Sequence, residues 1–274
     1  MSHKKGPVSA TRNFKRKPSE LPEGVFLVEG IAAIREYAKF RPESILKIII
    51  KDSRDKNLNA LVGQLPIDKK LIEQSVSEAM GDSSNSFQSP VVAHVHHELI
   101  QLHDFEKCLD VQYEKKGLIL ALDHISDPRN LGAILRSAGF FGIKHVIVPE
   151  RRQVLLTQSA VNTAQGGFAV CDLVVVVNLS RALERLKEFG FWVVSADMEG
   201  LSLDQFKEQQ RFEKTVLVLG NEESGVSKNI LDRSDLRLSI SGVDSGLESL
   251  NVSVAAGILM NALKNAKSQI DLKS

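Results

Sequence analysis

The sequence predicts an α/β protein whose strands form a mostly parallel or mixed sheet. Three observations support this fold class. Short apolar runs such as GLILALD at 117–123 are typical of strands buried on both faces of a sheet. The stretches between them, such as 178–189, carry leucines at helical spacing. Polar loops and single glycines separate the two kinds of segment, so strands and helices alternate along the chain.

The first predicted unit is a small α/β domain at 23–100. Helices are expected at 30–40 and around 58–65, where apolar residues recur on one helical face. Strands are expected at 45–51 and 91–95, because both runs are short, apolar and rich in β-branched residues.

A second, larger domain is predicted at 117–274. The stretch 101–116 before it is polar and charged without strong periodicity, and we interpret it as a partly helical linker. About six strands are expected in the larger domain, at 117–123, 145–148, 171–177, 191–196, 216–219 and 236–240. Helices are expected at 130–141, 178–189 and 251–267, with Asn130 and Asn251 as plausible N-caps.

Composition places the chain among ordinary globular proteins. It has 274 residues, 43% hydrophobic and 25% charged. No apolar run approaches the roughly 20 residues that span a bilayer, and no signal peptide opens the chain. These features favour a cytoplasmic protein. Accordingly, Cys108 and Cys171 are expected to be buried thiols and not a disulfide.

The first 22 residues are predicted to be a flexible tail with a strong positive charge. Its basic residues are Lys4, Lys5, Arg12, Lys15, Arg16 and Lys17, against only Glu20 as an acidic residue. Few apolar residues accompany them, so the segment should not pack. Two interpretations stay open, a solvated tail and a basic arm that neutralises phosphates of a nucleic acid.

Two polar segments, 220–225 and 249–253, suggest one ligand pocket. Each lies at a junction between a strand and a helix, and ligands of parallel α/β folds bind at the carboxyl ends of strands. A dinucleotide site would require Gly-x-Gly-x-x-Gly after the first strand, yet 123–129 contains no glycine. No Walker-type Gly-Lys-Ser/Thr occurs either.

The sequence gives little support for a metal site or a catalytic dyad. His94 and His96 share a strand face, but only Glu98 lies near enough to extend a ligand set, so a half-exposed strand end is favoured. The pair Asp123-His124 could form a dyad or metal site. No serine or cysteine elbow accompanies it, so a loop with side-chain turns is favoured and no metal is expected.

Three segments together resemble the signatures of a known enzyme family. They are DPRNLGAILRSA at 127–138, LVLGNEESGV at 217–226 and SLNVSVAAG at 249–257. In this order they resemble the SpoU/TrmH branch of the SPOUT RNA methyltransferases. The unit at 23–100 is more weakly similar to the small substrate-binding domain of members that methylate a guanosine ribose of large-subunit (23S) ribosomal RNA.

The resemblance implies a fold, a cofactor and a reaction. It implies a trefoil-knotted α/β domain that binds S-adenosylmethionine, without a metal, and methylates a ribose 2′-hydroxyl of structured RNA. It also implies a homodimer in which each active site is completed across the subunit interface. Transfer RNA as the substrate remains an alternative, as does an inactive RNA-binding factor in ribosome assembly that keeps the fold.

The resemblance also implies roles for individual residues. Arg136 matches the arginine that activates the ribose hydroxyl; because guanidinium stays protonated, we expect it to bind the adjacent phosphate and ease alkoxide formation. A purely structural pairing of Arg136 with Glu222 is the alternative. Asn130 would cap its helix and orient Arg136 or the substrate, and Glu222 would orient Arg136. The third signature contributes the short polar side chains of Ser249, Asn251 and Ser253.

The cofactor is expected to lie against Leu219, Gly220, Ile240 and Leu250. Gly220 would allow close approach of the adenosine, while Ile240 and Leu250 would flank the adenine or be plain core residues. The loop 241–248 has serine where many relatives have proline and is one residue longer than in close relatives.

Basic residues outside the signatures are candidate RNA contacts. Arg129, Arg151 and Arg152 lie at or near the ends of expected strands, and Lys15, Arg16 and Lys17 lie in the tail. Solvated surface arginines are the alternative.

Overall fold

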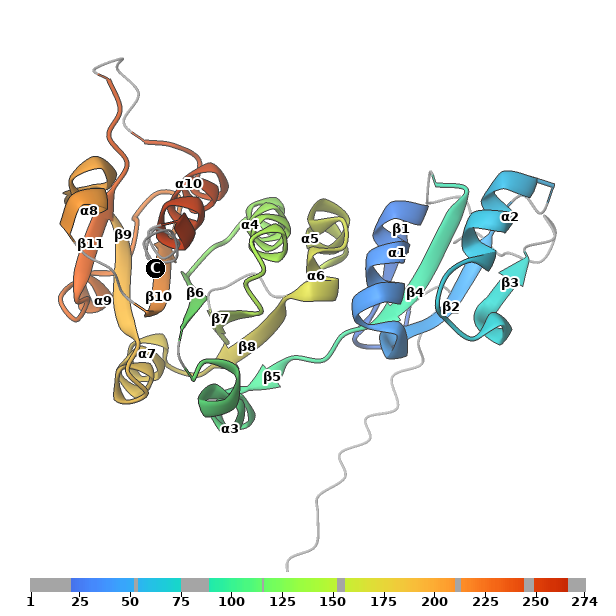
Figure 1. Cartoon of the computed structure of the whole chain (residues 1–274), viewed down its shortest axis with the longest axis horizontal. Coiled ribbons are helices and arrows are strands. Elements are labelled where there is room, and N and C mark those ends of the chain that lie inside the picture. The colour runs from blue at the N-terminus through green and yellow to red at the C-terminus, as the bar shows by residue number, and fades with distance from the viewer. Residues whose placement is uncertain are drawn as a thin grey trace, which may run out of the picture.

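The computed structural model contains two sheets joined by helices (Figure 1). It describes residues 21–51, 54–74, 89–114, 116–151, 156–209, 213–243 and 249–265. Four candidate RNA contacts, Lys15, Arg16, Lys17 and Arg152, lie outside the described residues, as does most of the predicted tail.

The smaller sheet has four strands in the order β1-β4-β2-β3. The strands are β1 (Val25–Glu29), β2 (Ile45–Ile50), β3 (Ile72–Gln74) and β4 (Val91–His96). β4 runs antiparallel to both neighbours, while β2 and β3 are parallel, so the sheet is mixed. The helices α1 (Ile31–Phe40) and α2 (Lys56–Gly63), with the 3-10 turns η1 (Pro42–Ser44) and η2 (Lys69–Leu71), complete this unit.

The larger sheet has seven strands in the order β11-β9-β10-β6-β7-β8-β5, and every neighbouring pair is parallel. The strands are β5 (Ile100–Gln101), β6 (Gly117–Asp123), β7 (His145–Pro149), β8 (Asp172–Val176), β9 (Trp192–Ser202), β10 (Lys214–Gly220) and β11 (Leu236–Ser239). All their carboxyl ends therefore meet at one edge. The predicted α/β class and mostly parallel sheet are confirmed.

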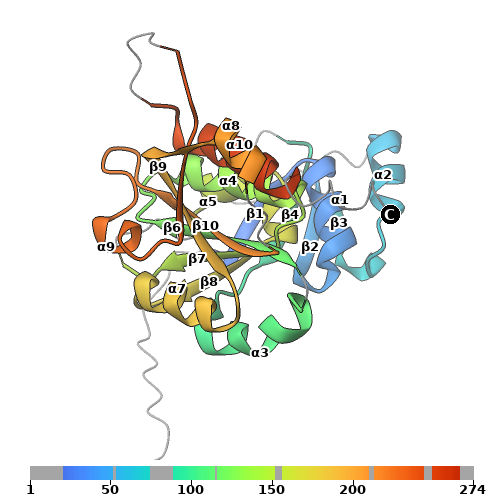
Figure 2. The ribbon, with the colours of Figure 1, turned by 60° about the vertical axis from the view of Figure 1, so that its left-hand side comes forward.

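Helices cover both faces of the larger sheet (Figures 1 and 2). On one face lie α4 (Pro128–Phe140), α5 (Gln158–Ala164), α6 (Gly167–Val170), α8 (Leu203–Gln209) and α10 (Val252–Asn265). On the other lie α3 (Leu102–Gln112), α7 (Leu179–Glu188) and α9 (Lys228–Leu231).

The apolar run of β6 is explained by these two layers. Leu120 and Leu122 belong to the core on the α4 side, while Ile119 and Ala121 belong to the core on the α3 and α7 side. Because successive side chains of a strand point to opposite faces, both sets must be apolar when both faces are covered.

The stretch interpreted as a linker, 101–116, is packed into the larger unit instead. β5 adds an edge strand beside β8, and the helix α3 follows at once. Phe105, Leu109 and Tyr113 are buried against the sheet. These three residues recur at helical spacing, and the many charged residues between them mask the pattern in the sequence.

The two sheets meet through α5 and α6. The Gln158 carboxamide accepts a hydrogen bond from Leu27 N at 2.9 Å and donates one to Leu27 O at 2.6 Å, so it satisfies backbone groups at the edge of β1. Arg41, after α1, donates to Asp172 Oδ1 at 2.5 Å and to Ala169 O at 3.1 Å. Polar contacts thus fix how the small unit sits on the large one.

A buried histidine reinforces this junction. His97 follows β4, and its Nε2 lies 2.6 Å from the hydroxyl of Tyr37 on α1. Its ring also lies 5.5 Å from that of Phe168 on α6, measured between centroids. Burial is the main cause that lowers the pKa of His97 to about 4, so the ring is neutral at pH 7.

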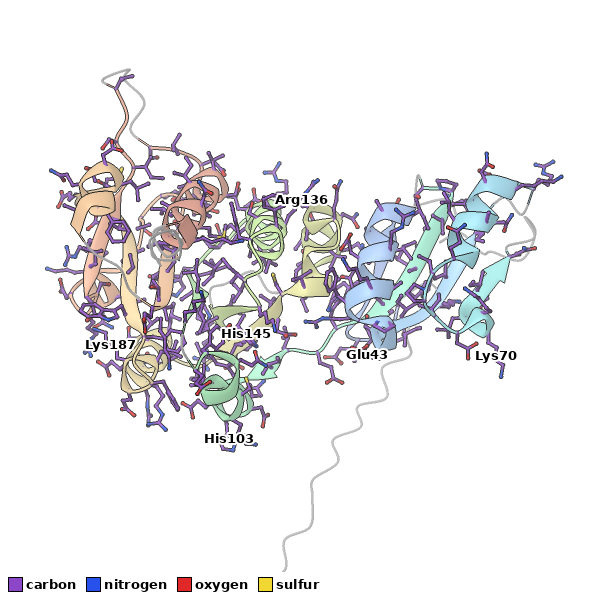
Figure 3. All side chains as sticks on the ribbon, viewed as in Figure 1. Glu43, Lys70, His103, Arg136, His145 and Lys187 are labelled. Carbon is purple, nitrogen blue, oxygen red and sulfur yellow. The ribbon has the colours of Figure 1, made fainter. Side chains whose placement is uncertain are left out.

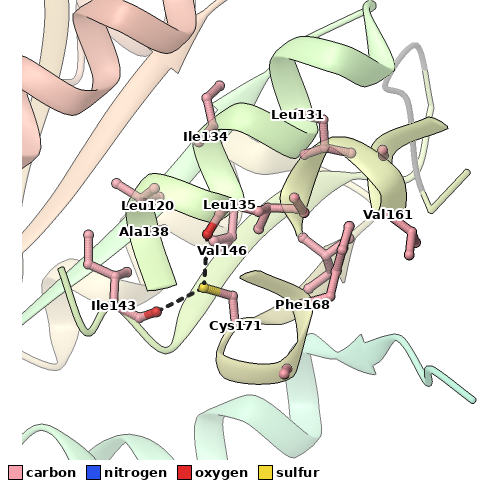
Figure 4. Packing of buried hydrophobic residues seen from close by; sticks show 14 of the residues in the cluster. Leu120, Leu131, Ile134, Leu135, Ala138, Ile143, Val146, Val161, Phe168 and Cys171 are labelled. Atoms are coloured by element: carbon pink, nitrogen blue, oxygen red, sulfur yellow. Dashed lines mark hydrogen bonds between the residues drawn. The ribbon is translucent and has the colours of Figure 1, made fainter. Parts of the chain in front are cut away.

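Helix α4 is packed into the buried core of the larger unit (Figure 4). Leu131, Leu135 and Ala138 are fully buried in the core. Cys171 beside them is a free, buried thiol whose Sγ lies 3.1 Å from Ile143 O. Burial raises its pKa to about 12, so it is an inert core residue, as predicted.

The packing of α4 on α5 predicts opposite outcomes for two glycines of the same helix. A Cβ at Gly132 would lie 2.5 Å from Ala160 O, whereas a Cβ at Gly139 would meet its nearest atom at 3.5 Å. We expect Gly132→Ala to lower the free energy of unfolding by about 1–3 kcal/mol through overpacking. Gly139→Ala should be neutral or stabilising by up to about 1 kcal/mol through helix propensity.

Urea denaturation of both variants and the wild type measures this difference. Equal stability of Gly132→Ala and Gly139→Ala would contradict the close approach of α4 and α5.

Candidate functional site

The first two signature segments leave the large sheet from neighbouring strands. β6 and β10 are paired so that Leu122 lies opposite Leu219 and Asp123 opposite Gly220. The loop that precedes α4 and the turn at 221–225 therefore start side by side at the carboxyl edge. This is the edge at which ligands of parallel α/β sheets bind.

The N-cap of α4 is Asp127, and the prediction of Asn130 as the cap is wrong. Asp127 Oδ1 accepts a hydrogen bond from Arg129 N at 2.8 Å, and Pro128 occupies the first helical position. Proline is favoured there because its missing N–H would have no helical partner. Asn130 is consequently the third helical residue, and its side chain is free to contact other segments.

Asn130 joins the three signature segments. Its Nδ2 donates to Glu222 Oε1 at 2.6 Å, and its Oδ1 accepts from Asn251 Nδ2 at 3.0 Å. An amide can donate and accept at the same time, so one side chain satisfies a carboxylate and a second amide. Residues 92 and 121 positions apart in sequence are thereby held in contact.

Asn251 caps α10, as predicted. Its Oδ1 accepts from Ser253 N at 2.9 Å and from Ser253 Oγ at 2.6 Å. The same side chain uses its Nδ2 to reach Asn130. Ser249, two residues earlier, is exposed on the approach to this cap.

Arg136 is not part of the Asn130 network within one chain. It lies on the exposed surface of α4 (Figure 3), and among the described residues its side chain forms no hydrogen bond or ion pair. The expected pairing with Glu222 is absent, because Glu222 contacts Asn130. Arg136 lies six positions after Asn130 in the helix, which corresponds to about 9 Å along the axis and roughly 120° around it.

The turn after β10 explains why residue 220 is glycine. Asn221 and Gly225 exchange two backbone hydrogen bonds of 2.9 and 3.0 Å, with Gly225 in the left-handed region at φ 66°. A Cβ on Gly220 would lie 2.0 Å from the carbonyl carbon of Gly225. The group that approaches Gly220 closely is therefore the backbone of Gly225 in the protein's own turn. From the sequence, the adenosine of the cofactor was expected in that place.

The other cofactor candidates differ in exposure. Leu219 is buried within β10, and Ile240 is half-buried against the core. Leu250 is 50% exposed, so a plain core role does not apply to it. The five residues 244–248, within the loop flagged in the sequence, lie outside the described part of the chain.

Two arginines of the candidate RNA surface are described. Arg129 is exposed and binds the Asp127 carboxylate through Nε and Nη2, with the shortest contact at 2.7 Å. These hydrogen bonds hold the pKa of Asp127 below its usual value. Arg151 is exposed just beyond the end of β7.

Asp123 is a site residue, whereas the sequence favours a plain loop with side-chain turns at this position. It is only 2% exposed, and its Oδ2 accepts from Ser227 N at 2.7 Å, while Oδ1 lies 2.7 Å from His124 Nδ1. His124 O in turn accepts from Asn221 Nδ2 at 2.9 Å. The signal was an aspartate directly ending an apolar strand, where a carboxylate needs partners to be buried.

Comparisons with known proteins identify the family of this chain. The family model of the SpoU rRNA Methylase family matches residues 117–261. A TrmH family protein of Staphylococcus aureus strain COL, whose name mentions tRNA and rRNA methylation together, is 33% identical over 238 residues, covering 85% of this chain and 93% of its own length.

Two solved structures share the fold. The SpoU methyltransferase AviRb from Streptomyces viridochromogenes, in complex with AdoMet, has 20% identity and a TM-score of 0.68, covering 90% of this chain and 91% of its own. A structure described as an RNA 2′-O ribose methyltransferase has 20% identity and a TM-score of 0.67, covering 89% of each chain.

The class defined by fold and site is that of the α/β RNA methyltransferases. This chain belongs to the SpoU/TrmH family. Within the described residues, no group of three histidine, cysteine or acidic side chains is placed to hold a metal ion. None of the described helices is long and apolar enough to cross a membrane.

Proposed function

We propose that this protein transfers a methyl group from S-adenosylmethionine to a ribose 2′-hydroxyl of structured RNA, with a guanosine of large-subunit ribosomal RNA as the preferred target. The observation that carries this proposal is the contact of Asn130 with both Glu222 and Asn251. Three separate segments converge there at the carboxyl edge of a parallel sheet, where a reaction site is expected.

The residues present fit the proposed cofactor. Ile240 and Leu250 offer partly exposed apolar surface that a flat adenine ring can cover, and the backbone around Leu219 and Gly220 lies at the same sheet edge. Bound there, S-adenosylmethionine would supply an activated methyl group, so the protein needs to provide only position and electrostatics.

The side chains of the site match the needs of hydroxyl methylation. The ribose hydroxyl must lose a proton, and the neighbouring phosphate carries negative charge. Arg136, which has no partner among the described residues, is available to bind that phosphate and stabilise the developing alkoxide. Asn130 and Asn251, each fixed by a neighbour, orient the substrate, since pre-set geometry is a large part of such a rate enhancement.

A homodimer would unite Arg136 with the Asn130 network. Arg136 lies on a different side of α4 from Asn130, so one chain does not bring them together. Leu250, Val254 and Ile258 form an exposed apolar stripe at and along α10, which packs on α4. Such a stripe is typical of a surface that another chain covers, and covering it would place a second copy beside the site.

Ribosomal RNA is preferred over transfer RNA because of the small unit at 23–100. Its fixed position on α5 and α6 would extend the RNA-binding surface beyond the reaction site. The same reaction on transfer RNA is the second candidate, since the name of the Staphylococcus relative mentions both RNAs.

Labelled-methyl transfer tests the proposed reaction. Purified protein is incubated with labelled S-adenosylmethionine and unmodified transcripts of 23S ribosomal RNA or transfer RNA. We expect label in ribosomal RNA, and a loss of at least about 100-fold in Arg136→Ala because transition-state charge stabilisation is removed. Arg181→Ala, an exposed arginine on α7, is the matched control and should keep full activity.

The possible results separate the alternatives. Label only in transfer RNA would select the second candidate. Absence of transfer to either RNA would reject the enzyme in favour of an inactive binding factor, and full activity of Arg136→Ala would reject the role of that residue.

Charge placed on the α10 stripe tests the dimer. Ile258 and Leu61 are both 37% exposed helical residues, but Leu61 lies on α2 of the small unit. We expect Ile258→Arg to halve the mass measured by analytical ultracentrifugation and to abolish methyl transfer, because a buried unpaired charge disrupts an interface. Leu61→Arg should remain dimeric; a monomeric wild type would refute this arrangement.

A further inference from the structure

A cavity of 390 Å³ opens at the carboxyl edge of the large sheet, beside Asp123. Its walls come from the ends of β6, β7 and β8 and from the starts of α7 and α9. They include His124, Arg151, Val177, Ser180 and Asn229. None of the residues assigned to methyl transfer lines it, and its volume falls within the range of small-ligand sites, about 300–1,000 Å³.

His124 is held in a strained conformation at this cavity. Its φ is 63°, and only one other non-glycine residue in the described part of the chain has a positive φ. L-residues with a side chain adopt this region at an energetic cost. Two contacts hold His124 in this conformation. Asn221 Nδ2 donates a hydrogen bond to the carbonyl of His124, and His124 Nδ1 lies against the buried carboxylate of Asp123. Strain maintained in this way is characteristic of functional positions.

The contact with Asp123 defines what the histidine ring can do. A carboxylate 2.7 Å from Nδ1 favours the tautomer that carries its proton on that nitrogen, in which Nε2 is a hydrogen-bond acceptor. Both oxygens of Asp123 already have protein partners, because its Oδ2 accepts a hydrogen bond from Ser227 N. An N–H or O–H group of a ligand is therefore the natural partner of His124.

The remaining walls supply complementary chemistry. Arg151 is exposed and has no side-chain partner among the described residues, so its guanidinium is available for a phosphate. Val177 is 86% exposed and offers an apolar surface. Ser180 and Asn229, joined by a 2.7 Å hydrogen bond, offer polar groups. These walls would complement a ligand that has an anionic group, a flat apolar face and hydrogen-bonding edges. A nucleotide has all three features.

We propose that this cavity receives a second nucleotide of the RNA substrate, close to the one that is methylated, with its phosphate on Arg151 and an N–H or O–H group on His124 Nε2. The inference rests on the proposed function. The backbone connects the two places, because Asn221, which holds His124, directly precedes Glu222, which holds Asn130. The cavity would thus set which RNA sequence or shape is accepted.

Photo-crosslinking in the full-length protein tests occupancy without requiring catalysis. A benzophenone amino acid replaces Val177, and the matched control carries it at Met198, another exposed apolar residue outside the cavity. We expect a transcript of 23S ribosomal RNA to crosslink at 177 and not at 198. Excess unlabelled transcript should abolish the crosslink, while millimolar guanosine monophosphate should not. No crosslink at 177, or competition by the mononucleotide alone, would overturn the proposal.

Neutralising the arginine tests the phosphate contact. Arg151→Gln should weaken binding of the same transcript about threefold to tenfold and reduce the slope of log affinity against log salt by about 1. Arg181→Gln, close by on α7 but outside the cavity, should bind like the wild type. His124→Gly keeps the left-handed backbone accessible and should also weaken binding. Unchanged affinity in both Arg151→Gln and His124→Gly would refute the assignment.

These measurements separate the cavity from the reaction. A wild type that crosslinks at 177 but transfers no methyl group supports the cavity and rejects the proposed function. A wild type that methylates RNA, with no crosslink and an unchanged Arg151→Gln, rejects the cavity alone.

Discussion

The carboxamide of Asn130 is the interaction on which the arrangement of the site depends. It accepts from Asn251 and donates to Glu222, so the start of α4, the turn after β10 and the cap of α10 are fixed relative to one another. This is possible because Asp127, and not Asn130, caps α4. A capping side chain would have turned back to its own helix, and the three segments would then lack a common partner.

The parallel sheet makes this convergence possible. Pairing of β6 with β10 places Asp123 opposite Gly220, so the loops that follow both strands begin at one point. Helix α4 is held there by buried contacts that include Leu131 and Leu135. The contacts of Arg41 and Gln158 across to the other unit then fix the small sheet relative to the same helices. The positions of the site residues therefore depend on contacts of α4 and of the small unit that lie away from the site.

Much of the fold could be predicted from the sequence, because apolar runs and helical spacing report burial directly. The strands around Leu217 and Ile147 were predicted within a few residues. The strand β5 and the helix α3 were not predicted, since β5 has only two residues and α3 carries many charges. β9 runs on to Ser202 beyond its apolar part, because Gly200 allows the backbone of Arg237 on β11 to approach closely.

The sequence indicated which segments meet at the site more than how their side chains pair. Hydrogen-bond partners depend on side-chain direction, which no periodicity encodes. Glu222 was expected to orient Arg136 and instead contacts Asn130. The strained His124 and its partner Asp123 carried only a local signal, an acidic residue and a histidine at a strand end. Their significance emerges from the cavity that they line.

A double-mutant cycle between Asn130 and Glu222 tests the central claim most directly. The catalytic efficiency of methyl transfer to RNA is measured for Asn130→Ala, Glu222→Ala and the double variant, with melting temperatures as the check on folding. If one network orients the substrate, the double variant should lose about as much activity as the more damaged single variant, because the residues act as a unit. Losses that simply multiply would mean that the two side chains act independently and that the network does not organise the site.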